Sequence, residues 1–232
     1  MPAVQNRYDW RQHVLPHLNR EWRVELFQAP VEAPASCLFG GLCVPCSAYE
    51  QRKRLLHVTG EPYVPCAGLF GRCFSEPCDE NFLCAEVACC PQMAASANRF
   101  MMQTRFGLRN TQCDDALMQA TACIWCCVNL MQCFRCLVRT AKDFGQDVGG
   151  LDECAGELPV EEMRLVADCL FVCIHGCMYA QQKVELDDFE GDEHRAYSGP
   201  PRGVLESVPP KMKVMMENGR IVRRAPEQNR MF

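Results

Sequence analysis

The sequence lacks the motifs of the common catalytic and phosphate-binding sites. It contains no G-x-S-x-G, no phosphate-cradling glycine loop and no H-E-x-x-H. Its net charge of −5 also argues against a general nucleic-acid binder, because such proteins use basic patches to meet the phosphate backbone. We therefore expect a protein that is not an enzyme and that has no nucleic-acid partner.

Export and transit signals are lacking as well. The N-terminal stretch carries charged residues throughout, without an apolar segment or a small-residue cleavage site. Asp9, Glu21 and Glu25 argue against a transit peptide, which is poor in acidic residues. We therefore expect a cytoplasmic chain in a reducing environment. Thiols there are more often metal ligands, buried hydrophobic groups or redox groups than disulfides.

Cysteine is the residue that the sequence has in excess. The chain has 19 cysteines in 232 residues, all between Cys37 and Cys177, and none near either end. This is about 8% of the chain, near the level of a disulfide scaffold in short secreted proteins. The odd number leaves at least one thiol unpaired within the chain, which favours roles other than a complete set of disulfides.

Composition divides the chain into an N-terminal arm (1–36), a cysteine-rich domain (37–186) and a polar linker and tail (187–232). Within the domain, 37–92 is rich in glycine and proline and is expected to be loop-rich, whereas 93–186 is expected to be helical. The predicted fold is therefore mainly α, a small cysteine-rich domain with an irregular loop region, a central helical hairpin and a C-terminal tail.

Three helices are predicted in the second half of the domain. The first covers Ala94–Arg105, and the second begins at the acidic pair Asp114 and Asp115 and ends at about 142. The third follows Pro159 and covers about 160–186. In the loop-rich half, only Ser47–Val58 has enough helix-forming residues for a clear turn or two.

Both ends of the chain carry local signals. Pro16 interrupts an aromatic and basic pattern near the N-terminus, which predicts two short helical turns or an arm. The arm either grips a membrane surface or a partner, or packs on its own domain, and we favour the second. Near the C-terminus, Asn218-Gly219 between two apolar-alternating stretches predicts a β-hairpin.

The stretch Ala116–Phe134 contains no charged residue and approaches the length of a bilayer crossing. Polar residues inside it, and Arg135 directly after it, favour a buried helix instead. The partner stretch Leu165–Ala180 is short and contains Asp168 and His175. We expect these two helices to form a buried hairpin of a soluble domain, with interfacial, re-entrant or fully inserted placement in a membrane as the alternative.

Six cysteines of the loop-rich region are candidate ligands of a structural metal ion. The spacing of Cys43-Val-Pro-Cys46 lets two thiolates reach one zinc ion. A segment with so little apolar material needs a cross-link, so we expect bound zinc, and consider an iron–sulfur cluster less favoured. The candidate ligands are Cys43, Cys46, Cys66, Cys73, Cys78 and Cys84. Disulfides in an oxidising compartment, or a redox-active C-x-x-C, are the alternatives, although the latter usually occurs in a βαβ context.

Further cysteines recur along the two long predicted helices. Cys169, Cys173 and Cys177 are four residues apart and so share one helix face, and others gather between Cys123 and Cys136 on the preceding helix. Facing thiols could hold a metal ion or an iron–sulfur cluster between the helices. We favour the simpler interpretation that these cysteines are small buried hydrophobic residues.

Several motifs resemble one family. They are Trp22…Leu26-Phe27, Cys37…Cys43-Val-Pro-Cys46, Tyr49-Glu-Gln51, Arg105-Phe-Gly-Leu108, Cys113-Asp114-Asp115 and Cys173…Cys177…Gln181…Glu185. Together they resemble the cysteine-rich family named after placenta-specific gene eight, which includes cornifelin and the plant cell-number regulators. The resemblance covers about 22–186. It departs from the family where Cys-Val-Pro-Cys replaces Cys-Pro-Cys and where 47–104 forms a long insert with cysteines of its own.

The resemblance implies a non-enzymatic, often membrane-associated protein, linked in plants to organ size control and metal-ion handling. Our preferred hypothesis is a metal-stabilised, cysteine-rich adaptor or regulatory protein in the cytoplasm, peripheral to a membrane, that binds another protein or a second copy of itself. The first alternative is a membrane-inserted modulator of divalent metal or calcium flux. The second is a thiol–disulfide redox protein that uses Cys43 and Cys46.

Overall fold

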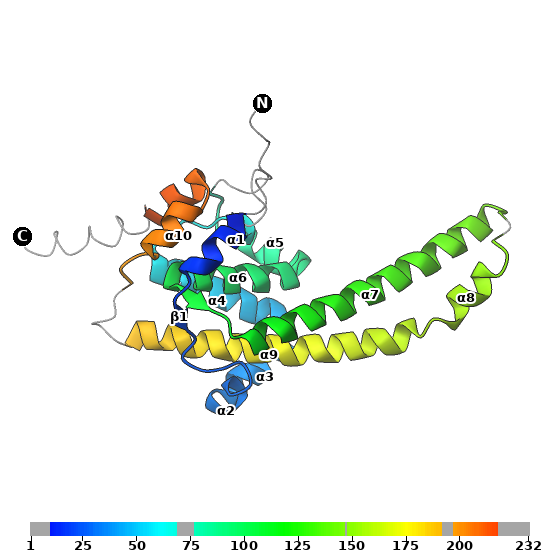
Figure 1. Cartoon of the computed structure of the whole chain (residues 1–232), viewed down its shortest axis with the longest axis horizontal. Coiled ribbons are helices and arrows are strands. Elements are labelled where there is room, and N and C mark those ends of the chain that lie inside the picture. Colours follow the sequence, from blue (N-terminus) through cyan, green and yellow to red (C-terminus); the bar gives the residue numbers. More distant parts are fainter. Residues whose placement is uncertain (1–9, 69–76, 147, 192–196, 218–232) are drawn as a thin grey trace, which may run out of the picture. The chain divides into compact units, whose positions relative to one another are not determined.

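Residues 10–68, 77–146, 148–191 and 197–217 are described by the computed structural model (Figure 1). The chain divides into two units, which are treated separately below. Unit 1 comprises Met1–Thr111 and His175–Phe232, and unit 2 comprises Gln112–Ile174. The described residues are mainly helical, with one short pair of strands, which confirms the predicted mainly-α class.

Most of unit 1 is built from short and medium helices. In chain order its first part contains α1 (Trp10–Val14), η1 (Leu15–His17), β1 (Arg20–Glu21), α2 (Ala29–Glu32), α3 (Pro34–Leu42), α4 (Val44–Thr59), η2 (Pro65–Gly68), α5 (Asn81–Cys89), α6 (Pro91–Phe106) and β2 (Leu108–Arg109). The two strands pair in parallel, with Arg20 opposite Leu108. The unit is completed by α9 (Val160–Gly191) from His175 onward, by α10 (Arg202–Ser207) and by a helical stretch over 210–217.

The segment 37–92 is largely helical where it is described, so the prediction of a loop-rich region is wrong. Two of its prolines begin α-helices instead of breaking them. Pro45 occupies the first turn of α4, where a missing N–H costs nothing. Pro91 does the same for α6. Gly60 ends α4 in the left-handed conformation, with φ of 68°, as a C-terminal cap.

Side chains of this segment join an apolar core with α6 and α9. Leu55 of α4, Leu83 of α5 and Met102 of α6 are completely or almost completely buried in one cluster, and Leu186 of α9 joins them. Burial of side chains of this size contributes about 1.5–3 kcal/mol each. The expectation that the segment 37–92 buries little apolar area is therefore wrong, while its need for a cross-link stays a prediction.

The N-terminal arm packs on its own unit, as we favoured from the sequence. Val14 and Leu18 are buried in a second cluster with Val204 of α10 and with Met212 and Met216 of the stretch 210–217. The predicted linker therefore contributes to a core. The residues 210–217 form a helix, since the methionines of this stretch recur with helical spacing. The first strand of the predicted β-hairpin is therefore absent from these residues. Asn218-Gly219 and the second arm lie outside the described residues.

Small residues let α3 pack closely against α9 within unit 1. A Cβ at Gly176 would lie 2.5 Å from the carbonyl oxygen of Cys37, and a Cβ at Gly40 would lie 2.6 Å from the Cβ of Tyr179. The Nδ1 atom of His175 lies 2.9 Å from the carbonyl oxygen of Gly40. This close approach fixes α3, and with it the corner at which α4 begins.

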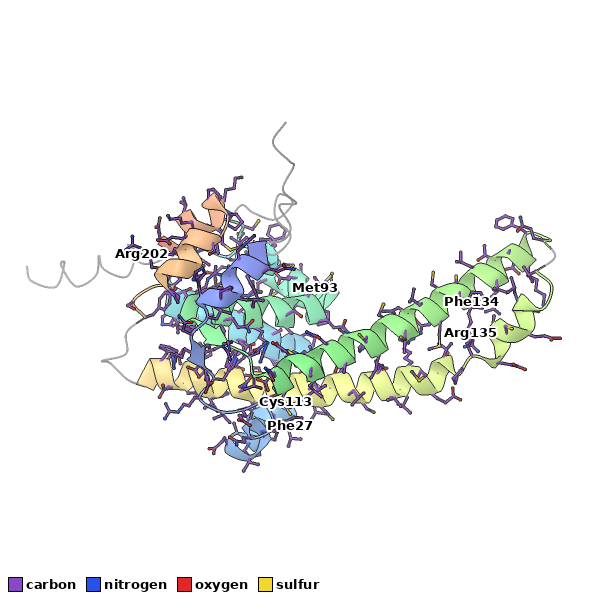
Figure 2. All side chains as sticks on the ribbon, viewed as in Figure 1. Phe27, Met93, Cys113, Phe134, Arg135 and Arg202 are labelled. Atoms are coloured by element: carbon purple, nitrogen blue, oxygen red, sulfur yellow. A yellow bond between two sulfur atoms is a disulfide. The ribbon has the colours of Figure 1, made fainter. Side chains whose placement is uncertain are left out.

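Unit 2 is a helical hairpin. It consists of α7 (Gln112–Asp143), α8 (Leu151–Glu157) and the first part of α9. After α8, the chain of α9 returns in the direction opposite to α7 (Figure 1). The predicted helices from 114 to about 142 and from about 160 to 186 are thus confirmed as α7 and α9. Trp125 meets Phe171 edge to face, with 6.4 Å between ring centroids. Arg135, which is labelled in Figure 2, donates from Nε to the carbonyl oxygen of Ala155 at 2.8 Å.

Candidate functional site

The described cysteines fall into one disulfide and a larger set of free thiols. Cys43 and Cys46 are bonded to each other. Most of the free thiols are exposed, including those of the long helices at Cys123, Cys126, Cys133 and others. The interpretation of the helical cysteines as buried hydrophobic residues is therefore wrong. Cysteine burial depends on what packs against a helix face, which the spacing along one helix does not determine.

The six predicted metal ligands are not gathered into one site in the part of the chain that is described. Cys43 joins α3 to α4, and Cys46 lies in the first turn of α4. Cys66 lies in η2, Cys78 precedes α5 and Cys84 lies on α5. Cys73 lies outside the described residues. No group of three or more His, Cys, Asp or Glu side chains that could hold a metal ion occurs among the described residues. Bound zinc therefore stays a prediction.

Unit 1 instead contains buried charges that satisfy one another. Glu86 of α5 accepts hydrogen bonds from the Tyr63 hydroxyl at 2.7 Å and from the backbone N–H of Cys66 at 2.9 Å. Arg52 of α4 lies 3.4 Å from the same carboxylate, and its Nε atom donates to Asn98. Partial burial and the nearby Glu86 charge raise the pKa of the Cys66 thiol to about 11. Cys66 is therefore a poor source of thiolate at neutral pH.

A second buried pair joins α6 to the chain that follows α4. Arg105 donates from Nε to Glu61 Oε1 at 2.9 Å and from Nη2 to Glu61 Oε2 at 2.6 Å, with side-chain exposures of 2% and 4%. Burial lowers the pKa of Arg105, but the Glu61 carboxylate outweighs it and raises the pKa above its ordinary value. Such a two-point contact fixes geometry as well as charge.

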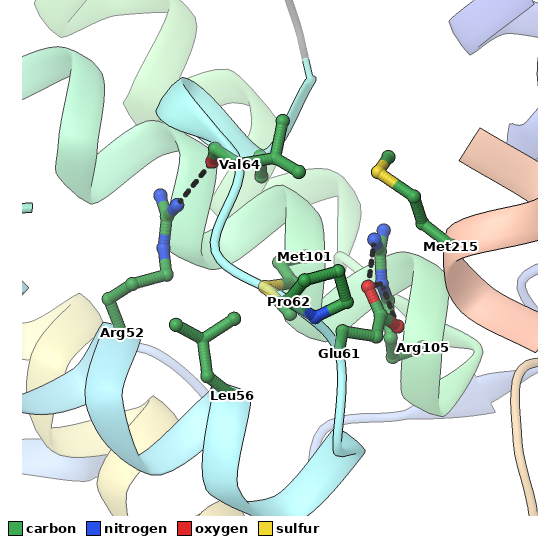
Figure 3. A pocket seen from close by; sticks show the side chains of 9 residues that line it. Arg52, Leu56, Glu61, Pro62, Val64, Met101, Arg105 and Met215 are labelled. Carbon is green, nitrogen blue, oxygen red and sulfur yellow. Dashed lines mark hydrogen bonds and ion pairs between the residues drawn. The ribbon is translucent and has the colours of Figure 1, made fainter. Parts of the chain in front are cut away.

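A small pocket lies beside these two arginines (Figure 3). Its lining includes Arg52, Glu61, Met101, Arg105 and Met215. The cavity volume is about 10 Å³, which is the room for one water molecule. Both arginines already have hydrogen-bond partners, so this pocket offers neither the space nor the free polar groups that binding an organic substrate requires.

The hairpin of unit 2 buries a narrow seam. The buried residues of α7 are Asp114, Thr121, Val128 and Val138, of which the first three are seven positions apart and the last follows after ten. On the first part of α9, Val160, Ala167 and Ile174 are also seven positions apart. A coiled-coil seam buries two positions in every seven, whereas α7 buries four of its 32 residues. Most of each helix surface is therefore left without a protein partner in the described structure.

Apolar side chains lie on that uncovered surface (Figure 2). Leu130 and Leu137 of α7 are each 64% exposed, and Leu165 of α9 is 66% exposed. Two helical regions are long and apolar enough to cross a membrane, α7 and Leu151–Glu190, and only 17% and 33% of their most apolar stretches are buried. The expectation that this hairpin is buried is therefore wrong for unit 2, while its placement relative to a membrane stays a prediction.

Compared with models of known protein families, with curated proteins and with solved structures, the chain matches none. The resemblance to the placenta-specific-gene-eight family therefore stays a prediction from its motifs.

Several motif residues do lie together in unit 1. Arg99 stacks over the Trp22 ring at 4.6 Å and donates to Gln181 at 2.8 Å, and Glu185 accepts from the backbone N–H of Arg23 at 3.0 Å. Sequence reasoning missed Arg99, because no local pattern distinguishes an arginine that is buried from one that is exposed. These contacts hold the N-terminal arm on α9.

Proposed function

We propose that the protein is a non-enzymatic, cysteine-rich adaptor that attaches to the surface of a membrane through the hairpin of unit 2. The observation that carries this proposal is the apolar surface of α7 outside its seam. Between Ala116 and Phe134 there is no charged residue, and only Thr121 and Val128 are buried. Water is a poor surrounding for such a helix, because exposed apolar area costs about 25 cal/mol per Å².

A lipid surface supplies the missing apolar partner. Amphipathic helices attach to membranes by burying one apolar face about 5–10 Å into the boundary between headgroups and acyl chains. Complete transfer of one leucine side chain contributes about 1.5–3 kcal/mol, so a few of these residues suffice for reversible attachment. Leu130, Leu137 and Leu165 are the side chains that we expect to enter the lipid.

The geometry supports interfacial or re-entrant placement more than a pair of complete crossings. From His175 onward α9 belongs to unit 1, where His175 and Gln181 are buried in protein. The remaining part of α9, from Val160 to Ile174, is about 22 Å long and contains Arg164 and Asp168. A hydrocarbon core is about 30 Å thick, so this stretch is too short and too charged to cross it.

The adaptor role is supported by unit 1. The pocket of Figure 3 is too small for a substrate, and the buried charges are used for packing. The same unit exposes apolar side chains on and beside α2 and α3, namely Phe27, Val31, Leu38 and Leu42. We expect this surface to contact a protein partner, since exposed apolar side chains gathered on adjacent elements are typical of interaction sites.

Flotation with phosphatidylcholine vesicles tests the attachment. The full chain, kept reduced, is compared with the double variant Leu130→Glu/Leu137→Glu and with Leu15→Glu, a matched control in unit 1 whose leucine is 57% exposed. The unaltered chain and the control should float, whereas the double variant should bind at least about tenfold more weakly. Circular dichroism should be the same for all three proteins.

Three outcomes contradict the proposal. The unaltered chain could stay with the soluble fraction, or the double variant could float as well as the control. The protein could also resist alkaline carbonate washing of membranes, which would show full insertion instead of surface attachment. If light scattering finds an oligomer that only the double variant loses, and no protein floats, a second copy covers the hairpin instead of lipid.

A further inference from the structure

The spacing C-x-x-C occurs three times in this chain, at 43–46, 123–126 and 133–136. The structure bonds the first pair and leaves the other two as exposed free thiols. Both free pairs lie inside α7. Side chains three residues apart within a helix have Cβ atoms about 5–6 Å from one another, beyond the roughly 3.5–4.5 Å of a disulfide. Spacing alone therefore does not select the bonded pair.

The first pair is bonded because Cys43 lies outside a helix. Cys43 is both the residue that ends α3 and the residue that precedes α4, with φ of −130° and ψ of 74°. Cys46 lies in the first turn of α4, and the two Cα atoms are 5.3 Å apart. The non-helical backbone at Cys43 allows its sulfur to reach the sulfur of Cys46, which a continuous helix does not allow.

The sulfur of Cys43 belongs to the corner residue itself, which is half-buried between the end of α3 and the start of α4.

The other sulfur is the more accessible one. Cys46 is exposed, whereas Cys43 is half-buried. An incoming thiolate therefore meets Cys46 first. Exchange requires access to the sulfur that is attacked, and the exposed Cys46 provides that access.

We propose that Cys43 and Cys46 form a thiol–disulfide exchange site for cellular dithiols. One thiolate of the dithiol attacks Sγ of Cys46, the Cys43–Cys46 bond breaks, and Cys43 leaves with the electron pair as a thiolate. The second thiolate of the dithiol then attacks its own first sulfur in the mixed disulfide and releases Cys46. The dithiol loses two electrons and becomes a disulfide, the protein gains them, and the two protons pass to the cysteine thiolates or to water.

The exchange acts on the joint between two helices. Cys43 is the single residue between α3 and α4, and α3 is fixed on α9 by the close approach at Gly40 and Gly176. The disulfide adds a covalent clamp to this joint, and reduction removes it. Disulfides of cytosolic proteins are mostly transient and either catalytic or redox-sensing, which agrees with a reversible clamp. This inference is independent of membrane attachment.

Equilibration of the full chain with mixtures of reduced and oxidised dithiothreitol tests the site. Samples are quenched in acid, alkylated and read by peptide mass spectrometry. The 43–46 pair should pass between bonded and free states as one two-electron couple, while Cys123 and Cys126, the matched pair of equal spacing, should be alkylated in every mixture. After full reduction, iodoacetamide should label the exposed Cys46 faster than the half-buried Cys43.

A second measurement identifies the attacked sulfur. Reduced Cys43→Ser protein, treated with glutathione disulfide, should accumulate a stable glutathione adduct on Cys46, whereas the unaltered chain should release glutathione and close its own disulfide. The proposal is overturned if the pair never forms in the oxidised mixtures, if Cys46 is labelled no faster than Cys43, or if reduction abolishes the helical circular dichroism. That last result would show a purely structural disulfide.

Discussion

The helices of unit 1 and the hairpin of unit 2 use similar sequence material in opposite ways. Unit 1 buries charged side chains in pairs, such as Arg105 with Glu61, and surrounds them with an apolar core. Unit 2 leaves apolar side chains and thiols on its surface, and only four of the 32 residues of α7 are buried. The difference teaches that the stability of the fold is concentrated in unit 1, while the hairpin is built to present a surface.

The thiols follow the same division. In unit 1 the Cys43–Cys46 disulfide closes a helix corner, and Cys66 is partly covered beside Glu86. In unit 2 the thiols of α7 are exposed and form no disulfide. Cysteine therefore has no single role in this chain, and its role depends on the surface around it.

The largest expected effect on stability comes from removing one partner of a buried ion pair, compared with one partner of an exposed pair. Glu61→Ala leaves the Arg105 guanidinium buried without its counter-charge and should destabilise the protein by about 3–5 kcal/mol. The matched change in unit 2, Glu161→Ala, removes an exposed partner 3.9 Å from Arg135 and should cost about 0–1 kcal/mol. Urea denaturation of both variants measures the difference, and equal losses would contradict our assignment of stability to unit 1.

A smaller effect compares two helical glycines. Gly176→Ala places a methyl group against the backbone of Cys37 and should destabilise the protein by about 1–3 kcal/mol. Gly156→Ala in α8 meets nothing within 4 Å and should stabilise its helix by up to about 1 kcal/mol. Thermal unfolding followed by circular dichroism should therefore give shifts of opposite sign. A shift of the same sign in both variants would rule out the close packing of α3 on α9.

The smallest effect on stability concerns the pH response of one thiol. Since the pKa of Cys66 is raised from an ordinary 9.0 to about 11, folding retains a proton that the unfolded chain releases, and the stabilising contribution falls as pH rises through this range. The alkylation rate of Cys66 should rise with a midpoint near 11. Glu86→Gln should lower that midpoint, because it removes the nearby negative charge.

The long helices could be predicted from sequence because their signals are local. Acidic first turns mark the starts of α7 and α9, and Gly107, with φ of 69°, marks the end of α6. The helices of the segment 37–92 could not be predicted. A proline in the first turn of a helix and a proline in a loop cannot be distinguished from the sequence alone. The candidate site was predicted only in part, in that Cys43 and Cys46 were singled out and their bond was left open.

The sequence by itself determined the helical class, the positions of the long helices and the charge-free run of α7, because capping and hydrophobic periodicity act over a few residues. Only the tertiary structure decided which arginines meet carboxylates, as Arg105 does with a residue 44 positions away, and which of three equal C-x-x-C spacings closes into a disulfide. Those outcomes depend on burial and on backbone conformation at single residues. Both are set by packing between segments far apart in the chain, and no local pattern records that packing.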